Sequence, residues 1–194
     1  MTTISTGFPD LSAAGGMQSR TVTMIHVPPL SRLTATLEAT GASHLVSLLS
    51  SEAEPPRPPH LDPACCLHLS MHDIIEEMPD LVPPSRAHVE RLLDFARAWD
   101  RSAPMVVHCF AGISRSTAAA YTIAAALQPG RDEMELAREL RRLAPSATPN
   151  ARIIALADDL LGRRGRMIEA IRAIGRGAEA FEGTPFALRV EAGR

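Results

Sequence analysis

Residues 105–116 read Met-Val-Val-His-Cys-Phe-Ala-Gly-Ile-Ser-Arg-Ser, and this stretch decides the fold. Its start, 105–107, is short, apolar and partly β-branched, which predicts an interior strand. The following residues, 116–127, are apolar on every side and rich in alanine, which predicts a helix that is buried all round. The loop between them therefore joins a buried strand to the N-terminus of a buried helix.

The chemistry of this loop follows from its position. The first backbone N–H groups of a helix have no helical partner, and the helix dipole adds positive charge, so an anion is favoured there. The same field favours the thiolate form of Cys109 and makes it a nucleophile. Arg115 presents two parallel donors to phosphoryl oxygens, and Gly112 allows a close approach or a positive φ. Ser116 places a hydroxyl beside the sulfur, where it can stabilise a leaving thiolate.

The order His108-Cys109, five intervening residues and then Arg115-Ser116, with Gly112 third after the cysteine, resembles the signature of cysteine-dependent protein tyrosine phosphatases. The wording HCFAGISRS is most similar to the dual-specificity branch and its bacterial relatives. The resemblance implies that Cys109 attacks phosphorus to form a phosphocysteine, that Arg115 holds the phosphoryl oxygens, and that Ser116 helps the thiolate leave. It also implies that His108 orders the loop and tunes the cysteine, and that no metal or cofactor is needed. The expected phosphate-binding loop comprises Phe110, Ala111, Gly112, Ile113, Ser114 and Arg115.

Cleavage of a phosphate ester also needs a proton for the departing oxygen. Asp73 directly follows the apolar run LHLSM, as the family's general acid does, and lies 36 residues before Cys109 (109 − 73). Asp80 lies 29 residues before Cys109 (109 − 80), in a proline-bounded loop. The usual spacing in the family falls between the two. We favour Asp73 because of its place at a strand end, with Asp80 as the alternative acid and a loop-capping role as the competing interpretation of Asp73.

Composition limits the class of protein. The chain has 194 residues, 45% hydrophobic and 22% charged, which suits one globular domain with a sizeable core. A net charge of −2 gives no basic field for nucleic acid or an anionic membrane. The N-terminal residues lack the basic start and apolar core of a signal peptide, and no window approaches the ~20 apolar residues of a membrane span. We expect a cytoplasmic protein.

Strands and helices alternate along the chain. Strands are predicted over 21–27, 42–49, 64–71 and 105–107, and helices over 31–40, 85–100, 116–127, 132–143 and 150–161, with Ser31, Asp132 and Asn150 as N-caps. This order predicts an α/β fold, a mainly parallel sheet flanked by helices, with the ligand at the carboxyl ends of the strands. Asp73 and Cys109 both fall at such ends.

Three segments are expected. Residues 1–20 form a flexible arm, residues 21–161 form the domain similar to tyrosine and dual-specificity phosphatases, and residues 162–194 form a C-terminal extension. The extension contains a short apolar stripe at Met167, Ile168, Ile171 and Ile174, which predicts a small helix followed by a tail.

The cysteines Cys65, Cys66 and Cys109 are too few for a disulfide framework, and no paired Cys or His spacing predicts zinc. Cys65 or Cys66 could form a protective disulfide with an oxidised Cys109, as in some relatives. Ordinary strand residues are the favoured interpretation of both.

The predicted function is a phosphatase acting on phosphotyrosine in proteins, with phosphoserine and phosphothreonine left open. No basic residue lies between residues 110 and 114, whereas relatives acting on phosphoinositides often place lysines there. The first alternative is a catalytically inactive phosphate-binding or scaffold relative. The second is a rhodanese-like sulfurtransferase, against which His108 and the Arg115-Ser116 ending argue.

Overall fold

A computed structural model describes residues 22–50 and 52–191, so the arm expected over 1–20 lies outside the described residues. Its centre is a five-stranded sheet in the order β3-β2-β4-β1-β5. The strands are β1 (Val22–Val27), β2 (His44–Leu49), β3 (Cys66–Ser70), β4 (Met105–His108) and β5 (Phe186–Glu191). Strands β3, β2, β4 and β1 pair in parallel, and β5 pairs antiparallel with β1. The predicted α/β fold with a mainly parallel sheet is confirmed.

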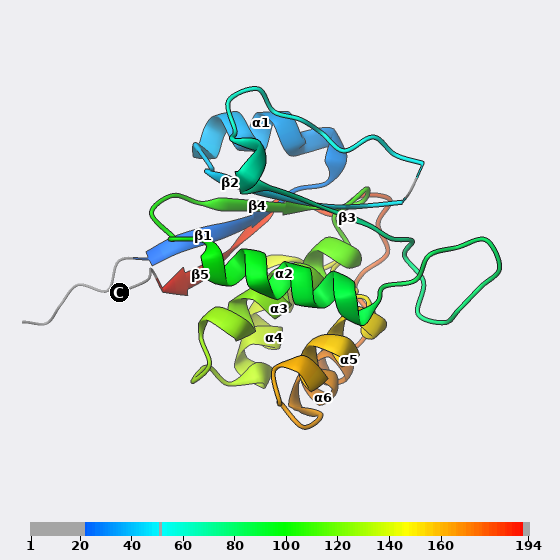
Figure 1. Cartoon of the computed structure of the whole chain (residues 1–194). Coiled ribbons are helices and arrows are strands. Elements are labelled where there is room, and N and C mark those ends of the chain that lie inside the picture. Colours follow the sequence, from blue (N-terminus) through cyan, green and yellow to red (C-terminus); the bar gives the residue numbers. More distant parts are fainter. Residues whose placement is uncertain (1–21, 51, 192–194) are drawn as a thin grey trace, which may run out of the picture.

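Helices cover both faces of the sheet unequally. The helices are α1 (Leu33–Thr40), α2 (Arg86–Ala98), α3 (Arg115–Leu127), α4 (Glu133–Leu143), α5 (Ala151–Leu160) and α6 (Arg166–Ile174). Helix α1 lies alone on one face, and the other five form a layer on the opposite face (Figure 1). Each parallel strand is followed by a helical or loop crossover, so the carboxyl ends of β3 and β4 meet at one edge.

Two of the three predicted N-caps are confirmed. Asp132 accepts a hydrogen bond from the N–H of Glu135, and Asn150 accepts from the first turn of α5. The prediction for Ser31 is wrong, because the chain leaves Pro29 through a 3-10 turn over Leu30–Arg32 and α1 begins without a side-chain cap. The Ser31 hydroxyl donates instead to Glu182, 2.9 Å away.

Helix α3 is the most buried helix of the described residues. Every residue from Arg115 to Ala125 is buried, as the apolar sequence predicts. The many alanines allow close approach of the sheet and of the neighbouring helices α2, α4 and α5. The helix that begins at the signature loop is therefore held on all sides.

The C-terminal extension differs from the prediction in one respect. The predicted helix is present as α6, whose N-terminal N–H groups at Gly165 and Met167 donate to the buried Asp158. The predicted tail, however, contains β5, which pairs along the whole of β1 and adds Leu188 to the core. Buried residues alternate with more exposed ones along 186–191, in the period-two pattern typical of a strand. The predicted tail did not include this strand. An unpaired β1 would leave its backbone groups open at the sheet edge.

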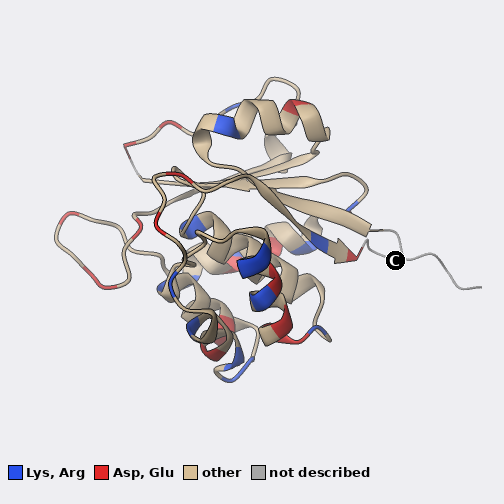
Figure 2. Ribbon diagram, turned by 180° about the vertical axis from the view of Figure 1, so that it is seen from behind, with Lys and Arg blue, Asp and Glu red and all other residues tan. Residues whose placement is uncertain are grey.

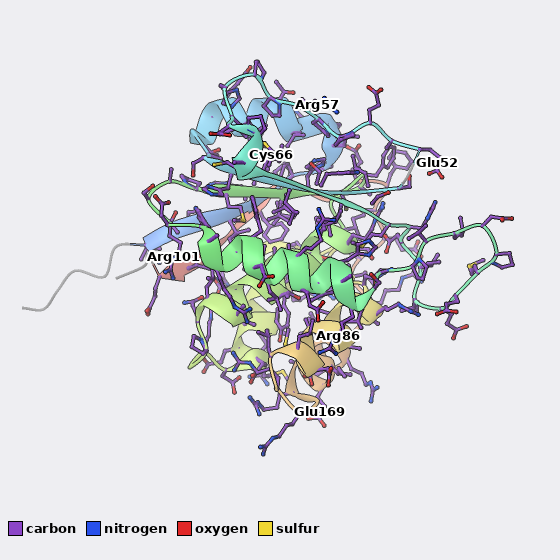
Figure 3. All side chains as sticks on the ribbon, in the orientation of Figure 1. Glu52, Arg57, Cys66, Arg86, Arg101 and Glu169 are labelled. Atoms are coloured by element: carbon purple, nitrogen blue, oxygen red, sulfur yellow. The ribbon has the colours of Figure 1, made fainter. Side chains whose placement is uncertain are left out.

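The alternative interpretation of Cys65 and Cys66, as disulfide partners of Cys109, does not agree with their positions. Cys65 lies in a 3-10 turn rather than on a strand, and Cys66 begins β3, in the small apolar cluster on the α1 side of the sheet. Figure 3 shows Cys66 on that side, beneath the loop that carries Arg57. Cys109 belongs to the opposite cluster. Two strand spacings and three residues separate Cys66 from Cys109, about 14 Å, whereas a disulfide needs Cα atoms within roughly 7 Å.

The described residues contain neither a membrane-spanning helix nor a cluster of metal ligands. No helix over residues 22–50 and 52–191 has the length and apolar character to span a bilayer. Within the same ranges no three His, Cys, Asp or Glu side chains gather as a set of metal ligands.

Candidate active site

Cys109 lies directly after β4, in a narrow turn that closes at the start of α3. Its side chain is 2% exposed. The Sγ atom lies 3.1 Å from Ser116 Oγ and accepts a hydrogen bond from the Gly112 N–H at 3.3 Å. Gly112 has a φ of +71°, and a Cβ there would lie 2.9 Å from the backbone nitrogen of Pro29. Both the conformation and the space therefore require glycine at this position.

The carbonyl groups of the loop point outward and are bound by distant segments. The backbone hydrogen bonds are Leu30 N to Phe110 O at 2.9 Å, Gly183 N to Ala111 O at 2.8 Å, Thr148 N to Ile113 O at 2.9 Å and Asn150 N to Ser114 O at 3.4 Å. In a trans peptide the C=O and the following N–H point in opposite directions. The N–H groups are thus directed into the loop, as the Gly112 N–H shows by donating to Cys109 Sγ. This geometry forms an anion-binding cradle.

Residues of the loop differ in exposure. Phe110 is 59% exposed at its outer edge, whereas Gly112 and Arg115 are buried. Ala111, Ile113 and Ser114 are half-buried. Only Phe110 therefore projects strongly from the rim.

His108 supports the loop from behind. Its Nδ1 donates to the Cys109 carbonyl at 3.2 Å, so its Nε2 accepts from the Ser47 hydroxyl at 2.7 Å in the neutral ring. Burial lowers the pKa of His108 to about 4, which keeps the ring neutral at physiological pH. The role of Ser47 was missed, because a serine inside a strand carries no signal of its partner 61 residues away.

Arg115 is the buried cation of the site. Its Nη1 donates to the Met71 carbonyl at 2.8 Å, which fixes the guanidinium beside the end of β3. Its Nε is buried without a hydrogen-bond partner and lies 3.9 Å from Asp73 Oδ2. A buried donor that lacks a partner is costly unless a ligand completes it. An anion in the loop would supply that acceptor.

Asp73, not Asp80, contacts the signature loop. Asp73 Oδ1 accepts from Ser114 Oγ at 2.7 Å and from Asn150 Nδ2 at 2.9 Å. The oxygen of the Asn150 amide caps α5, so this one side chain connects Asp73 to the N-terminus of a helix. Asp80 lies at an exposed turn with a φ of +61°, on the loop between β3 and α2. Figure 2 shows acidic residues along that loop, which projects from the body of the molecule.

Comparison with known proteins agrees with this geometry. Residues 76–145 match the family model described as protein-tyrosine phosphatase, and that range contains the signature loop and α3. The matched range covers 70 of the 194 residues, so part of this chain is similar to that family. Among the curated proteins no sequence matches this chain.

Solved structures show the same fold. Human DUSP28 is 19% identical, with a TM-score of 0.55 over 72% of this chain and 92% of that one. DUSP15 is 17% identical, with a TM-score of 0.53 over 77% and 89% of the two chains. PTPMT1, solved in complex with PI(5)P, is 13% identical, with a TM-score of 0.53 over 76% and 89%. Asp73, Asn150 and Gly183 lie outside the range that matches the family model.

Proposed function

We propose that this chain is a cysteine-dependent protein tyrosine phosphatase and that it hydrolyses phosphotyrosine in proteins through a phosphocysteine intermediate. The observation that carries the proposal is the combination of Cys109 and Arg115 in one loop. The sulfur lies in a cradle of inward N–H groups, and the Arg115 Nε is buried without a partner. Such a site binds a phosphoryl group next to a nucleophile.

In the first step Cys109 attacks phosphorus. The S–P bond forms while the P–O bond to the tyrosine breaks, and the departing oxygen takes a proton from Asp73. The two hydrogen bonds to Asp73 use Oδ1, which leaves Oδ2 as the oxygen that carries the transferred proton. Arg115 and the loop N–H groups stabilise the equatorial phosphoryl oxygens.

In the second step water attacks the phosphocysteine. Asp73, now a carboxylate, accepts a proton from the water as the new P–O bond forms and the S–P bond breaks. The Ser116 hydroxyl, 3.1 Å from Sγ, and the Gly112 N–H stabilise the leaving thiolate. The products are tyrosine and inorganic phosphate.

Protein substrates are favoured by the chemistry of the loop. Between Cys109 and Arg115 the side chains are aromatic, aliphatic or hydroxyl, and none is basic. An inositol ring that carries further phosphates would need cations that this loop does not supply. Whether phosphoserine and phosphothreonine are also hydrolysed depends on the depth to which the loop is recessed, and phosphopeptides of the three types distinguish these cases directly.

The test is hydrolysis of a small aryl phosphate from pH 5 to 9 in the presence of a chelator. The wild type, Cys109→Ser and Asp73→Asn are compared, with Asp80→Asn as the matched control on the same loop. We expect Cys109→Ser to abolish turnover and Asp73→Asn to lower kcat by roughly 100-fold or more, with loss of the decline at high pH. Asp80→Asn should retain wild-type kcat.

Other outcomes identify the alternatives. Full activity of Asp73→Asn together with a defective Asp80→Asn would transfer the acid role to Asp80. A wild type that binds phosphate without turnover would establish an inactive binding relative. Transfer of sulfur from thiosulfate to cyanide, in place of phosphate release, would establish the rhodanese-like reaction.

A further inference from the structure

Residues 175–185, the connection between α6 and β5, run past the signature loop, and we call this segment the strap. In Figure 1 it rises from the helical layer toward the sheet, at the edge where the strands end. Its backbone bonds the loop directly, since the Gly183 N–H donates to the Ala111 carbonyl at 2.8 Å. A Cβ at Gly183 would lie 2.7 Å from the Gly112 carbonyl oxygen. The strap therefore packs against the loop with no room for a side chain.

The other end of the strap is fixed to the turn that precedes α5. The Gly177 N–H donates to Thr148 Oγ1 at 3.1 Å, and the Ala178 N–H donates to the Pro145 carbonyl at 2.9 Å. Arg141 reinforces this attachment, because its guanidinium bonds carbonyl groups on both sides, at Pro145 and at Gly175. The strap is thus a fixed wall and not a free tail.

Between these attachments the strap encloses an open groove of about 740 Å³. One wall is Ile113 of the signature loop, the second is the turn at Ser146 and Thr148, and the third is the strap from Arg176 to Phe181. A volume of this size exceeds what a single side chain fills and lies in the range of peptide- and ligand-binding clefts. Ile113 belongs to both the phosphate-binding loop and the groove, so the groove borders the loop.

Phe181 is the unusual residue of the groove. Its side chain is 89% exposed, the highest value among the large exposed apolar residues of the described chain. An exposed aromatic ring beside a cleft offers a large apolar contact to a ligand that occupies the cleft. The charged residues at the groove, Arg176 and Glu179, have opposite signs, so the groove has no net charge that would favour a charged side chain, and Phe181 offers an apolar contact.

We propose that this groove binds the polypeptide segment flanking the phosphorylated residue of the substrate, with an apolar side chain of that segment packed on Phe181. The inference rests on the proposed function and adds the substrate class, an extended phosphopeptide with an apolar flanking residue. Because the strap lies outside the range that matches the family model, this specificity belongs to the C-terminal extension of this chain.

The test compares two substrates, a small aryl phosphate and a phosphotyrosine peptide with leucines on both sides of the phosphotyrosine. Phe181→Ala should lower kcat/KM for the peptide about tenfold, because it removes an aromatic contact with the flanking leucine, and should change kcat/KM for the aryl phosphate by less than twofold. Val22→Ala, an exposed apolar residue at the start of β1, is the matched control and should leave both values unchanged. A peptide with serine in place of the leucines should have a kcat/KM with the wild type that is lower by the same factor, and Phe181→Ala should not lower it further.

Two results would overturn the inference. One is an unchanged kcat/KM of Phe181→Ala for the leucine peptide. The other is an equal loss for both substrates, which would assign Phe181 to the support of the loop. Failure of the proposed function would look different, because the wild type would then hydrolyse neither substrate.

Discussion

The buried ring of His108 makes a specific prediction about acid stability. Its pKa in the folded protein is about 4, because burial disfavours the charged ring, against an ordinary histidine pKa of about 6.5. Between these values the unfolded chain binds the proton and the folded chain does not. The contribution of His108 is therefore complete above pH 6.5 and is lost as the pH falls from 6.5 toward 4.

The size of this effect follows from the two pKa values. Linkage over a pKa difference from 6.5 to about 4 gives a loss of roughly 2–3 kcal/mol in the free energy of unfolding between pH 7.5 and pH 4.5. This is a large part of the total stability of an ordinary domain, about 5–15 kcal/mol. Protonation of Nε2 also removes the acceptor for the Ser47 hydroxyl, so the loop should lose its support over the same range.

The assay is urea unfolding at pH 7.5 and pH 4.5 for the wild type and His108→Asn. The other histidines contribute equally to both proteins, so the difference between the two pH dependences isolates His108. The wild type should lose roughly 2–3 kcal/mol more than the variant. His60→Asn, in the exposed proline-rich loop, controls for the loss of one histidine. Equal losses in the wild type and His108→Asn would refute the reasoning.

Three further predictions concern the frame of the site. Gly112→Ala should lower the free energy of unfolding by about 2 kcal/mol or more and remove most of the activity, because the added Cβ meets Pro29 and the φ is +71°. Thermal unfolding and turnover of an aryl phosphate measure the two effects. Asn150→Ala should lower the free energy of unfolding by about 1 kcal/mol, because the helix loses its cap, and should lower kcat, because Asp73 loses a hydrogen bond. Asn150→Asp should keep the cap and lower kcat alone, because the new carboxylate repels Asp73. Gly183→Ala should displace the strap, with a loss of about 1–3 kcal/mol and a weaker affinity for inorganic phosphate measured by calorimetry.

Much of the site was predictable because its parts are contiguous. Cys109, Gly112 and Arg115 lie within seven residues, and their spacing is fixed by one strand-to-helix turn. The buried character of α3 was equally predictable from its uninterrupted apolar sequence. The position of Asp73 at a strand end was a weaker signal, and the structure brings it to the loop through Ser114.

The C-terminal extension shows the opposite case. Its helix was visible in the sequence. Its strand is only six residues long, and its period-two pattern does not identify the strand with which it pairs. A strand of this length gains most of its stability from pairing, and its partner β1 lies about 160 residues earlier in the chain. The strand is recognised only in the tertiary structure, where β1 offers the sheet edge with which β5 pairs.

By itself the sequence determined the local chemistry: a cysteine at the end of a buried strand, an arginine at the start of a buried helix, and the parallel sheet that places an aspartate at the same edge. The tertiary structure decided how these groups are held. Ser47 behind His108, Asn150 beside Asp73 and Gly183 against the loop act through hydrogen bonds or close packing between segments far apart in the chain. Such contacts obey no spacing rule, because the fold and not the chain sets the distance between the two partners.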